Sequence, residues 1–106
     1  MKRDRVPPID EENRPMEVRI YATLRPIVGG AIVPKVIEPG ETVRALVDGM
    51  VSRWPDLRPE MLDNDDNLLN RIHIFVNGRS IRYLENMDTV IHAHDNIAIF
   101  PPVGGG

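Results

Sequence analysis

Apolar and polar residues alternate strictly over residues 17–24, and this period of two is typical of a half-buried β-strand. A break over residues 25–30 separates this strand from a second extended segment, residues 32–38, where Pro34 indicates an edge or a bulge. The two segments are predicted to pair as a hairpin. The side expected to face the core carries Val18, Ile20, Ala22 and Leu24, and the other side carries Glu17, Arg19, Tyr21 and Thr23.

A helix is predicted to begin after residues 39–41. Pro39 and Gly40 end the extended segment, Thr42 is a suitable N-cap, and Glu41 lies near the positive end of the helix. Apolar residues then recur at helical spacing until Pro55 ends the helix, so they are assigned to the core. These residues are Val43, Leu46, Val47, Met50, Val51 and Trp54.

Residues 56–71 are polar and irregular, which predicts a surface connection with about one helical turn. Its apolar residues would seal the base of the core. The acidic and amide-rich residues 63–67 suggest a calcium loop, but the following glycine and the distal Glu of that motif are missing, so a solvated loop is favoured. The apolar residues are Leu57, Met61, Leu62, Leu68 and Leu69.

The clearest local signal is Asn77-Gly78, which lies between the apolar segments 72–76 and 80–84 and predicts a tight type I′ hairpin. A last short strand follows over residues 97–100 and is ended by two prolines. The order strand, strand, helix, strand, strand, strand predicts an α+β fold, with one main helix across a mixed sheet of about five strands. The crossover rule favours a β-grasp arrangement with the last strand beside the first.

Composition fits one small domain, since the 106 residues are 42% hydrophobic and 27% charged. We expect a flexible tail over residues 1–16, a β-grasp domain over residues 17–102 and a flexible glycine tail over residues 103–106. The formal net charge of -3 and the lack of a long basic stretch argue against nucleic-acid binding. No apolar run suits a membrane span or a signal peptide, so a cytoplasmic protein is expected.

Cysteine is absent, which excludes disulfides, thiol nucleophiles, thiolate metal sites and the iron-sulfur ligands of β-grasp ferredoxins. His92 and His94 have the spacing to share a face, but nearby residues offer no obvious further ligands, so no metal site is predicted. His73 falls on a strand and is expected to pack there. Phe100 either fills the core or lies on the outer face of the sheet as part of a docking patch.

The sequence ends in Val103 and three glycines, directly after Pro101 and Pro102. Consecutive prolines favour an extended exit from the sheet, and four extended residues reach roughly 13 Å. Glycines lack side chains, so a narrow channel of another protein can close around them. We therefore expect residues 103–106 to enter partner active sites, with Phe100, Pro101 and Pro102 as a docking surface. The alternative is an inert terminal segment.

Four segments of the chain resemble the ubiquitin-like sulfur carriers related to the small subunit of molybdopterin synthase and to the thiamine sulfur carrier. They are residues 54–58, 75–78, 80–84 and 99–106. The hairpin is most similar to the carriers that deliver sulfur for cysteine synthesis. Phe100-Pro101-Pro102 is closer to the molybdopterin branch, whereas the triple glycine is shared by some thiamine carriers. The resemblance covers about residues 17–106.

This resemblance implies a protein cosubstrate rather than an enzyme. An activating enzyme would use ATP to adenylate the Gly106 carboxylate, and a sulfur donor would convert it to a thiocarboxylate. The carrier itself would bind no cofactor. The implied acceptor is a cysteine synthase-like enzyme or the large subunit of molybdopterin synthase, and a metal-dependent carrier protease is a further partner.

Two alternatives to a cysteine-pathway carrier remain open. One is the small subunit of molybdopterin synthase, and the other is a protein modifier conjugated through Gly106. Only Lys2 and Lys35 are available for self-linked chains, which argues weakly against a polymer-forming modifier.

Overall fold

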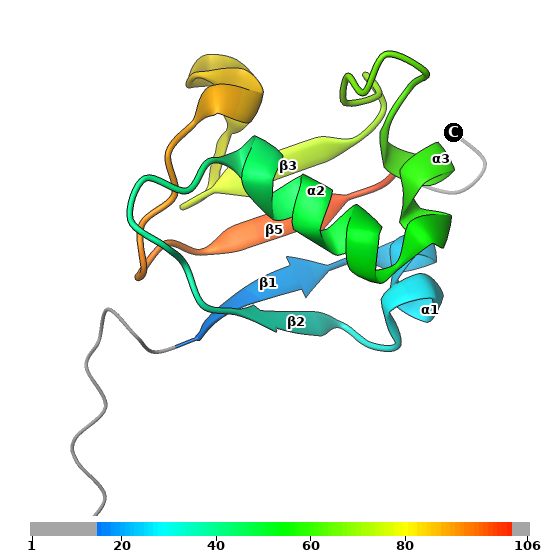
Figure 1. Ribbon diagram of the computed structural model, residues 1–106, viewed down its shortest axis with the longest axis horizontal. Coiled ribbons are helices and arrows are strands. Elements are labelled where there is room, and N and C mark those ends of the chain that lie inside the picture. Colours follow the sequence, from blue (N-terminus) through cyan, green and yellow to red (C-terminus); the bar gives the residue numbers. More distant parts are fainter. Residues whose placement is uncertain (1–14, 103–106) are drawn as a thin grey trace, which may run out of the picture.

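The computed structural model describes residues 15–102; residues 1–14 and 103–106 lie outside the described part (Figure 1). Its centre is a five-stranded sheet in the order β2-β1-β5-β3-β4. The strands are β1 (Met16–Ile20), β2 (Ile32–Lys35), β3 (His73–Val76), β4 (Arg79–Ser80) and β5 (Ile97–Phe100). One helix, α2 (Val43–Arg53), lies across one face of this sheet.

The sheet is mixed, and its register fixes the fold. β1 pairs with β2 antiparallel and with β5 parallel, with Val18 opposite Ile97. β3 pairs antiparallel with both β4 and β5, with Ile74 opposite Ile99. The last strand thus lies beside the first, so the prediction of an α+β β-grasp fold is confirmed.

The predicted first strand is too long. β1 ends at Ile20, and the chain continues through a 3₁₀ turn (Ala22–Leu24) into the short helix α1 (Arg25–Val28). Pro26 suits the first turn of α1, and Gly29 ends it with a left-handed φ of 84°. Leu24 still reaches the core, but from the turn, whereas Ala22 is exposed. The alternation of apolar and polar residues over residues 22–24 therefore predicted a strand where the chain forms a 3₁₀ turn.

Two other predicted strands are also shortened. β2 covers only Ile32–Lys35 of the segment 32–38, although Ile37 remains buried. β4 ends at Ser80, whose Oγ accepts a hydrogen bond from the Arg82 backbone N at 3.2 Å and begins a 3₁₀ turn (Ile81–Tyr83). A further 3₁₀ turn spans Asn86–Asp88. The chain thus passes from extended to turn conformation as soon as a local cap is available.

The helix and the Asn-Gly hairpin follow their sequence signals. Thr42 Oγ1 accepts a hydrogen bond from Ala45 N at 3.2 Å, as an N-cap should. Asn77 and Gly78 have φ values of 54° and 82°, the left-handed pair that a type I′ turn requires. The Asn77 side chain also joins the hairpin to the start of β5, because its Oδ1 accepts from Asn96 N at 2.8 Å.

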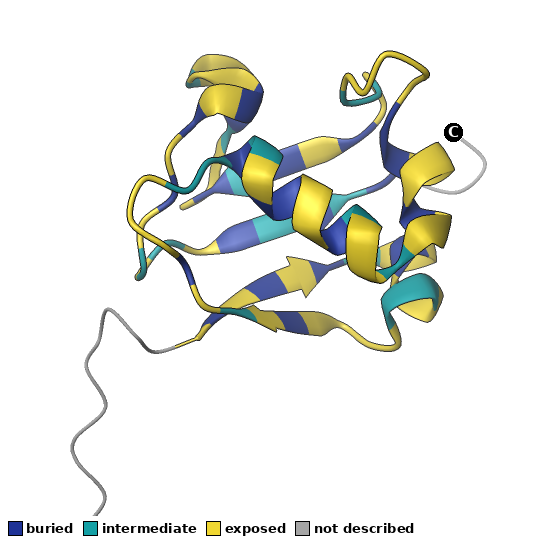
Figure 2. Cartoon of the chain, in the orientation of Figure 1, coloured by how far each residue is buried: buried dark blue, intermediate teal, exposed yellow. Residues whose placement is uncertain are grey.

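The core lies between α2 and the sheet, where Figure 2 shows buried positions alternating along the strands and forming a stripe on the helix. Val51 and Trp54 were expected in the core but are only partly buried at the end of α2. The Arg53 guanidinium lies over the Trp54 ring, with its Cζ 4.3 Å from the ring centre. After α2 the chain forms a 3₁₀ turn (Pro55–Leu57) and the short helix α3 (Arg58–Met61). Leu57, Met61 and Leu62 are buried there and close the base of the core.

Candidate functional site: the outer sheet face and the exit of β5

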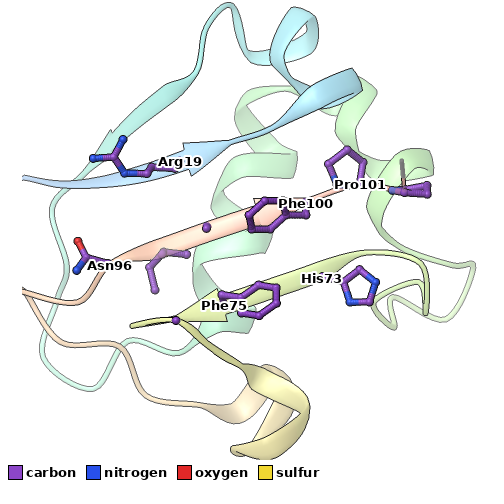
Figure 3. Close-up of a pocket in the computed structure, with 10 residues that line it drawn as sticks. Arg19, His73, Phe75, Asn96, Phe100 and Pro101 are labelled. Atoms are coloured by element: carbon purple, nitrogen blue, oxygen red, sulfur yellow. The ribbon is translucent and has the colours of Figure 1, made fainter. Parts of the chain in front are cut away.

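The face of the sheet opposite α2 carries a broad depression of about 610 Å³ (Figure 3). None of the described helices lies across it (Figure 1). Outward side chains of β1, β3 and β5 form its floor, because residues of these strands alternate between the core and this face. The lining residues are Arg19, His73, Phe75, Gly78, Asn96, Ile97, Ala98, Phe100, Pro101 and Pro102.

An aromatic cluster centred on Phe100 occupies one end of this depression. Phe100 stacks on Tyr21 with ring centres 4.1 Å apart and an interplanar angle of 11°, and it meets Phe75 edge-on at 5.5 Å. Of the two alternatives for Phe100, the structure therefore selects the outer face of the sheet. Neither Tyr21 nor Phe75 was identified from the sequence as a partner of Phe100, although Tyr21 was expected on the polar side of the first strand.

The exit of β5 is held firmly by the fold. β5 lies between β1 and β3, and the Tyr21 backbone N donates to Ile99 O at 3.2 Å, one residue before Phe100. Pro101 is buried and Pro102 is exposed, and both line the depression. The predicted docking residues Phe100, Pro101 and Pro102 are thus brought together on one surface. The predicted tail, Val103, Gly104, Gly105 and Gly106, lies outside the described residues.

Cationic side chains surround the aromatic cluster. Arg19 lines the depression from β1, and Arg25 lies over Tyr21, with its guanidinium carbon 5.4 Å from the ring centre. None of the described residues that line the depression carries a carboxylate. Arg19 Nη2 lies 3.9 Å from Glu17 Oε1, and this ion pair between exposed side chains contributes little to stability.

Arg82 completes the cationic set beside β3. Its Nη1 lies 3.0 Å from His73 Nδ1, and its Nη2 donates to the carbonyls of Asn70 and of Ile72, the latter at 3.2 Å. His73, expected to pack on its strand, is exposed on the outer face and borders this guanidinium. Arg25 and Arg82 were not identified from the sequence, since both come to lie beside this surface through contacts formed only in the fold.

His92, which precedes β5, stabilises a local turn in the structure. His92 Nδ1 lies 3.6 Å from Asp95 Oδ2, and the His92 backbone N donates to the same oxygen at 2.8 Å. Within the described residues, no three His, Cys, Asp or Glu side chains gather where they could hold a metal ion. Among residues 15–102, no helix has the length and apolar character needed to cross a membrane.

Comparison with protein families gives a match to the model of the ThiS family over residues 18–106. Small archaeal modifier protein 1 of Haloferax volcanii is 30% identical over 91 residues, which cover 86% of this chain and all of the relative (100%). The sulfur carrier protein CysO of Mycobacterium tuberculosis is 29% identical over 91 residues, which cover 84% of this chain and 96% of CysO.

Solved structures of two relatives have a similar fold. The crystal structure of the Haloferax volcanii protein SAMP1 superimposes with a TM-score of 0.76 at 28% identity, covering 87% of this chain and 99% of that one. A chain of the BexX/CysO complex of Amycolatopsis orientalis superimposes with a TM-score of 0.71 at 26% identity, covering 86% of this chain and 99% of that one.

Proposed function

The chain belongs to the ThiS family of ubiquitin-like sulfur carriers and modifiers, and we propose that it carries sulfur as a thiocarboxylate on Gly106. Members of this family are small carrier proteins rather than enzymes. The β-grasp domain would act as the recognition body, and its first strand begins at Met16, one residue earlier than the expected boundary at residue 17. It would work in the cytoplasm as a cosubstrate of other enzymes.

The observation that carries this proposal is the exit of β5. The central strand of the sheet leads the chain to Pro101 and Pro102 beside a half-buried aromatic cluster. The sequence that follows is Val103-Gly104-Gly105-Gly106, and the family match continues to residue 106. A partner that binds the outer face would therefore hold Pro102, the residue from which the glycine segment continues, at a fixed position relative to its own active site.

The chemistry requires only the terminal carboxylate from this chain. An α-carboxyl group has a pKa of about 3.5, so it is anionic at neutral pH. In the activating enzyme it would attack the α-phosphorus of ATP, forming an acyl-adenylate and releasing pyrophosphate. A sulfur donor would then attack the acyl carbon and displace AMP. ATP is bound by the activating enzyme, and no cofactor is assigned to the carrier itself.

Cysteine is the sulfur destination that we propose. The CysO relatives support it, as does the likeness of the hairpin to carriers of that pathway. The acceptor would be a cysteine synthase-like enzyme, and a metal-dependent carrier protease is a further partner. The small subunit of molybdopterin synthase is the alternative carrier role, in which the large subunit would accept the sulfur.

Conjugation to other proteins is the second candidate function, favoured by the likeness to the Haloferax volcanii modifier proteins. Activation of the carboxylate is common to both functions. Of the two lysines available for self-linked chains, Lys35 is ion-paired with Glu41 at 3.3 Å. That contact reduces its availability as an acceptor, so single conjugates are the expected form.

Intact-mass spectrometry tests the carrier role. The purified full chain is incubated with the activating enzyme of the same organism, ATP and sulfide, and replacement of one oxygen by sulfur is expected. Deletion of Gly105 and Gly106 should abolish the change, whereas Ser52→Ala on α2 should leave it intact. Adducts on added proteins would favour the modifier role. A chain whose mass never changes would contradict both.

A second incubation identifies the acceptor. The thiocarboxylated chain, carrying radioactive sulfur, is offered separately to the cysteine synthase and to the molybdopterin synthase large subunit of that organism. Label in free cysteine is expected. Label in a dithiolene product alone would overturn the proposed destination and leave the carrier role standing.

A further inference from the structure

The depression on the outer face is apolar at its floor and cationic at its rim, and the chain contains a segment of matching character. Residues 6–9 read Val-Pro-Pro-Ile, and residues 10–12 read Asp-Glu-Glu. Contiguous exposed apolar surface of this kind marks an interaction site. The apolar run would suit the floor formed by Phe75, Ala98 and Phe100, and the acidic run would suit the rim.

The place where the chain enters the sheet allows this contact. β1 runs parallel to β5 with Val18 opposite Ile97, so Met16 lies beside the start of β5. Asn96 and Gly78, which line the near end of the depression, are at that same end of the sheet. The segment before Met16 therefore begins next to the depression. Asn13 and Pro15 are residue types that favour the chain reversal required.

The segment also has the required length. From Asn96 to Pro102 the depression follows six extended steps of the chain, about 20 Å. If residues 13–15 make the reversal, six extended steps from Glu12 reach Val6 and span roughly the same distance. The acidic residues 10–12 would then lie over the near half of the depression, on the side of Arg19, and the apolar residues 6–9 over Phe75, Ala98 and Phe100. The cationic residues Lys2, Arg3 and Arg5 precede the apolar run and would extend past the aromatic end.

Charge favours the same arrangement. Arg19 lies on one side of the depression, and Arg82 with His73 lies on the other. Arg82 is held in place by its hydrogen bonds to backbone carbonyls, so it loses little side-chain entropy when it meets an acidic group. The carboxylate on this side, Glu17, is an exposed neighbour of Arg19, and it lowers the local positive potential without lining the depression.

We propose that the N-terminal segment, residues 1–14, folds back at Pro15 and occupies this depression in the free protein. The segment precedes the part shared with the family, since the family match begins at residue 18. If the outer face also binds the activating enzyme, which rests on the proposed function, the segment competes with that enzyme. The segment would then reduce the fraction of carrier that is competent to bind.

Paramagnetic relaxation tests the contact in the full chain. The chain has no cysteine, so Arg5→Cys provides a single site for a nitroxide label. Selective broadening of the backbone amides of His73, Phe75 and Phe100 is expected, while Ser52 on the opposite face stays sharp. Broadening should be lost when Asp10, Glu11 and Glu12 are replaced by Asn, Gln and Gln, and it should weaken in high salt.

The results distinguish the N-terminal segment from a second copy of the chain as the occupant of the depression. Broadening that is equal on both faces, or unchanged in the neutralised variant, would overturn the proposal. A mixture of isotope-labelled chains without nitroxide and unlabelled chains with nitroxide detects contacts between molecules. Broadening in that mixture alone would assign the depression to a second copy of the chain and would also overturn it.

A kinetic experiment tests whether the segment competes with the activating enzyme. With the activating enzyme, ATP and sulfide, the neutralised variant should show a KM lower by about two- to tenfold, which corresponds to a competent fraction of about one half to one tenth in the natural chain. Equal KM values would overturn the competition. Failure of both chains to form any thiocarboxylate would count against the proposed function, while the relaxation result would stand by itself.

Discussion

The two faces of the sheet are built from the same strands but differ in chemistry. On the inner face, Val18, Ile74 and Ile99 are aliphatic and at most 1% exposed beneath α2. On the outer face, the neighbouring residues Arg19, Phe75 and Phe100 are cationic or aromatic and line an open depression. Adjacent residues of one strand thus contribute to different properties. Stability should depend mainly on the inner face and recognition on the outer face, so single substitutions can separate them.

The largest loss of stability is expected at the centre of the inner face. Ile99 is completely buried, and Ile99→Ala should lower the free energy of unfolding by about 2 to 5 kcal/mol, because it removes apolar contacts and leaves a cavity. Ile99→Val, the matched control, should cost only about 0.5 to 1.5 kcal/mol. Urea denaturation followed by circular dichroism measures both. Equal losses for the two variants would contradict the tight packing of this face.

A smaller loss of stability, combined with a loss of recognition, is expected at the next residue of the same strand. Phe100→Ala removes two aromatic contacts, each worth roughly 0.5 to 1.5 kcal/mol beyond area burial, so the loss of these contacts should account for about 1 to 3 kcal/mol of the destabilisation. It should also raise the KM for activation while the chain remains folded. Thermal melting and thiocarboxylation assays give the two values.

Tyr83 provides the control for this substitution. It is 84% exposed, so Tyr83→Ala should change the free energy of unfolding by no more than about 0.5 kcal/mol. If Phe100→Ala were as harmless as Tyr83→Ala in both assays, the aromatic cluster would not be the recognition surface.

Most of the fold could be predicted from local signals. Thr42, Pro55 and Asn77-Gly78 each require a particular backbone geometry, and the structure shows all three in that geometry. The parallel pairing of β1 and β5 followed from the order of the elements. The end of β1 could not be predicted in the same way, since Leu24 is buried whether residues 22–24 form a strand or a turn.

The site was less predictable than the fold. β5 reads Ile-Ala-Ile-Phe, which is apolar on both sides, so alternation does not assign a face to Phe100. Its contacts depend on register between strands far apart in sequence, where His73 pairs with Phe100 and Phe75 with Ala98. The position of Arg82 depends in the same way on the carbonyls of residues 70 and 72. Such non-local contacts leave no trace in a short window of sequence.

An intermediate effect is expected at the helix that covers the inner face. Thr42 caps α2, and the neighbouring Val43 N donates to Thr89 O at 2.9 Å, which ties the helix to the segment before β5. Thr42→Ala should cost about 1 kcal/mol, because the Ala45 N–H loses its acceptor. Thr42→Ser keeps the hydroxyl and should cost less. Chemical denaturation distinguishes them, and equal losses would mean that the methyl group, not the cap, is responsible.

The smallest effect concerns the loop that closes the base of the inner face. Asp63 Oδ1 accepts hydrogen bonds from Asn67 N at 2.9 Å and from Asp65 N at 2.8 Å, and these bonds lower the pKa of Asp63 from its usual 3.8. Because the folded state has the lower pKa, the stabilisation is fully present above pH 3.8 and is lost as the pH falls through the folded value. The stability difference between the natural chain and Asp63→Asn should therefore shrink in acid. Carboxyl chemical shifts followed from pH 6 to about pH 2 give the midpoint directly. A midpoint at or above 3.8 would show that these backbone donors do not favour the carboxylate over the protonated acid.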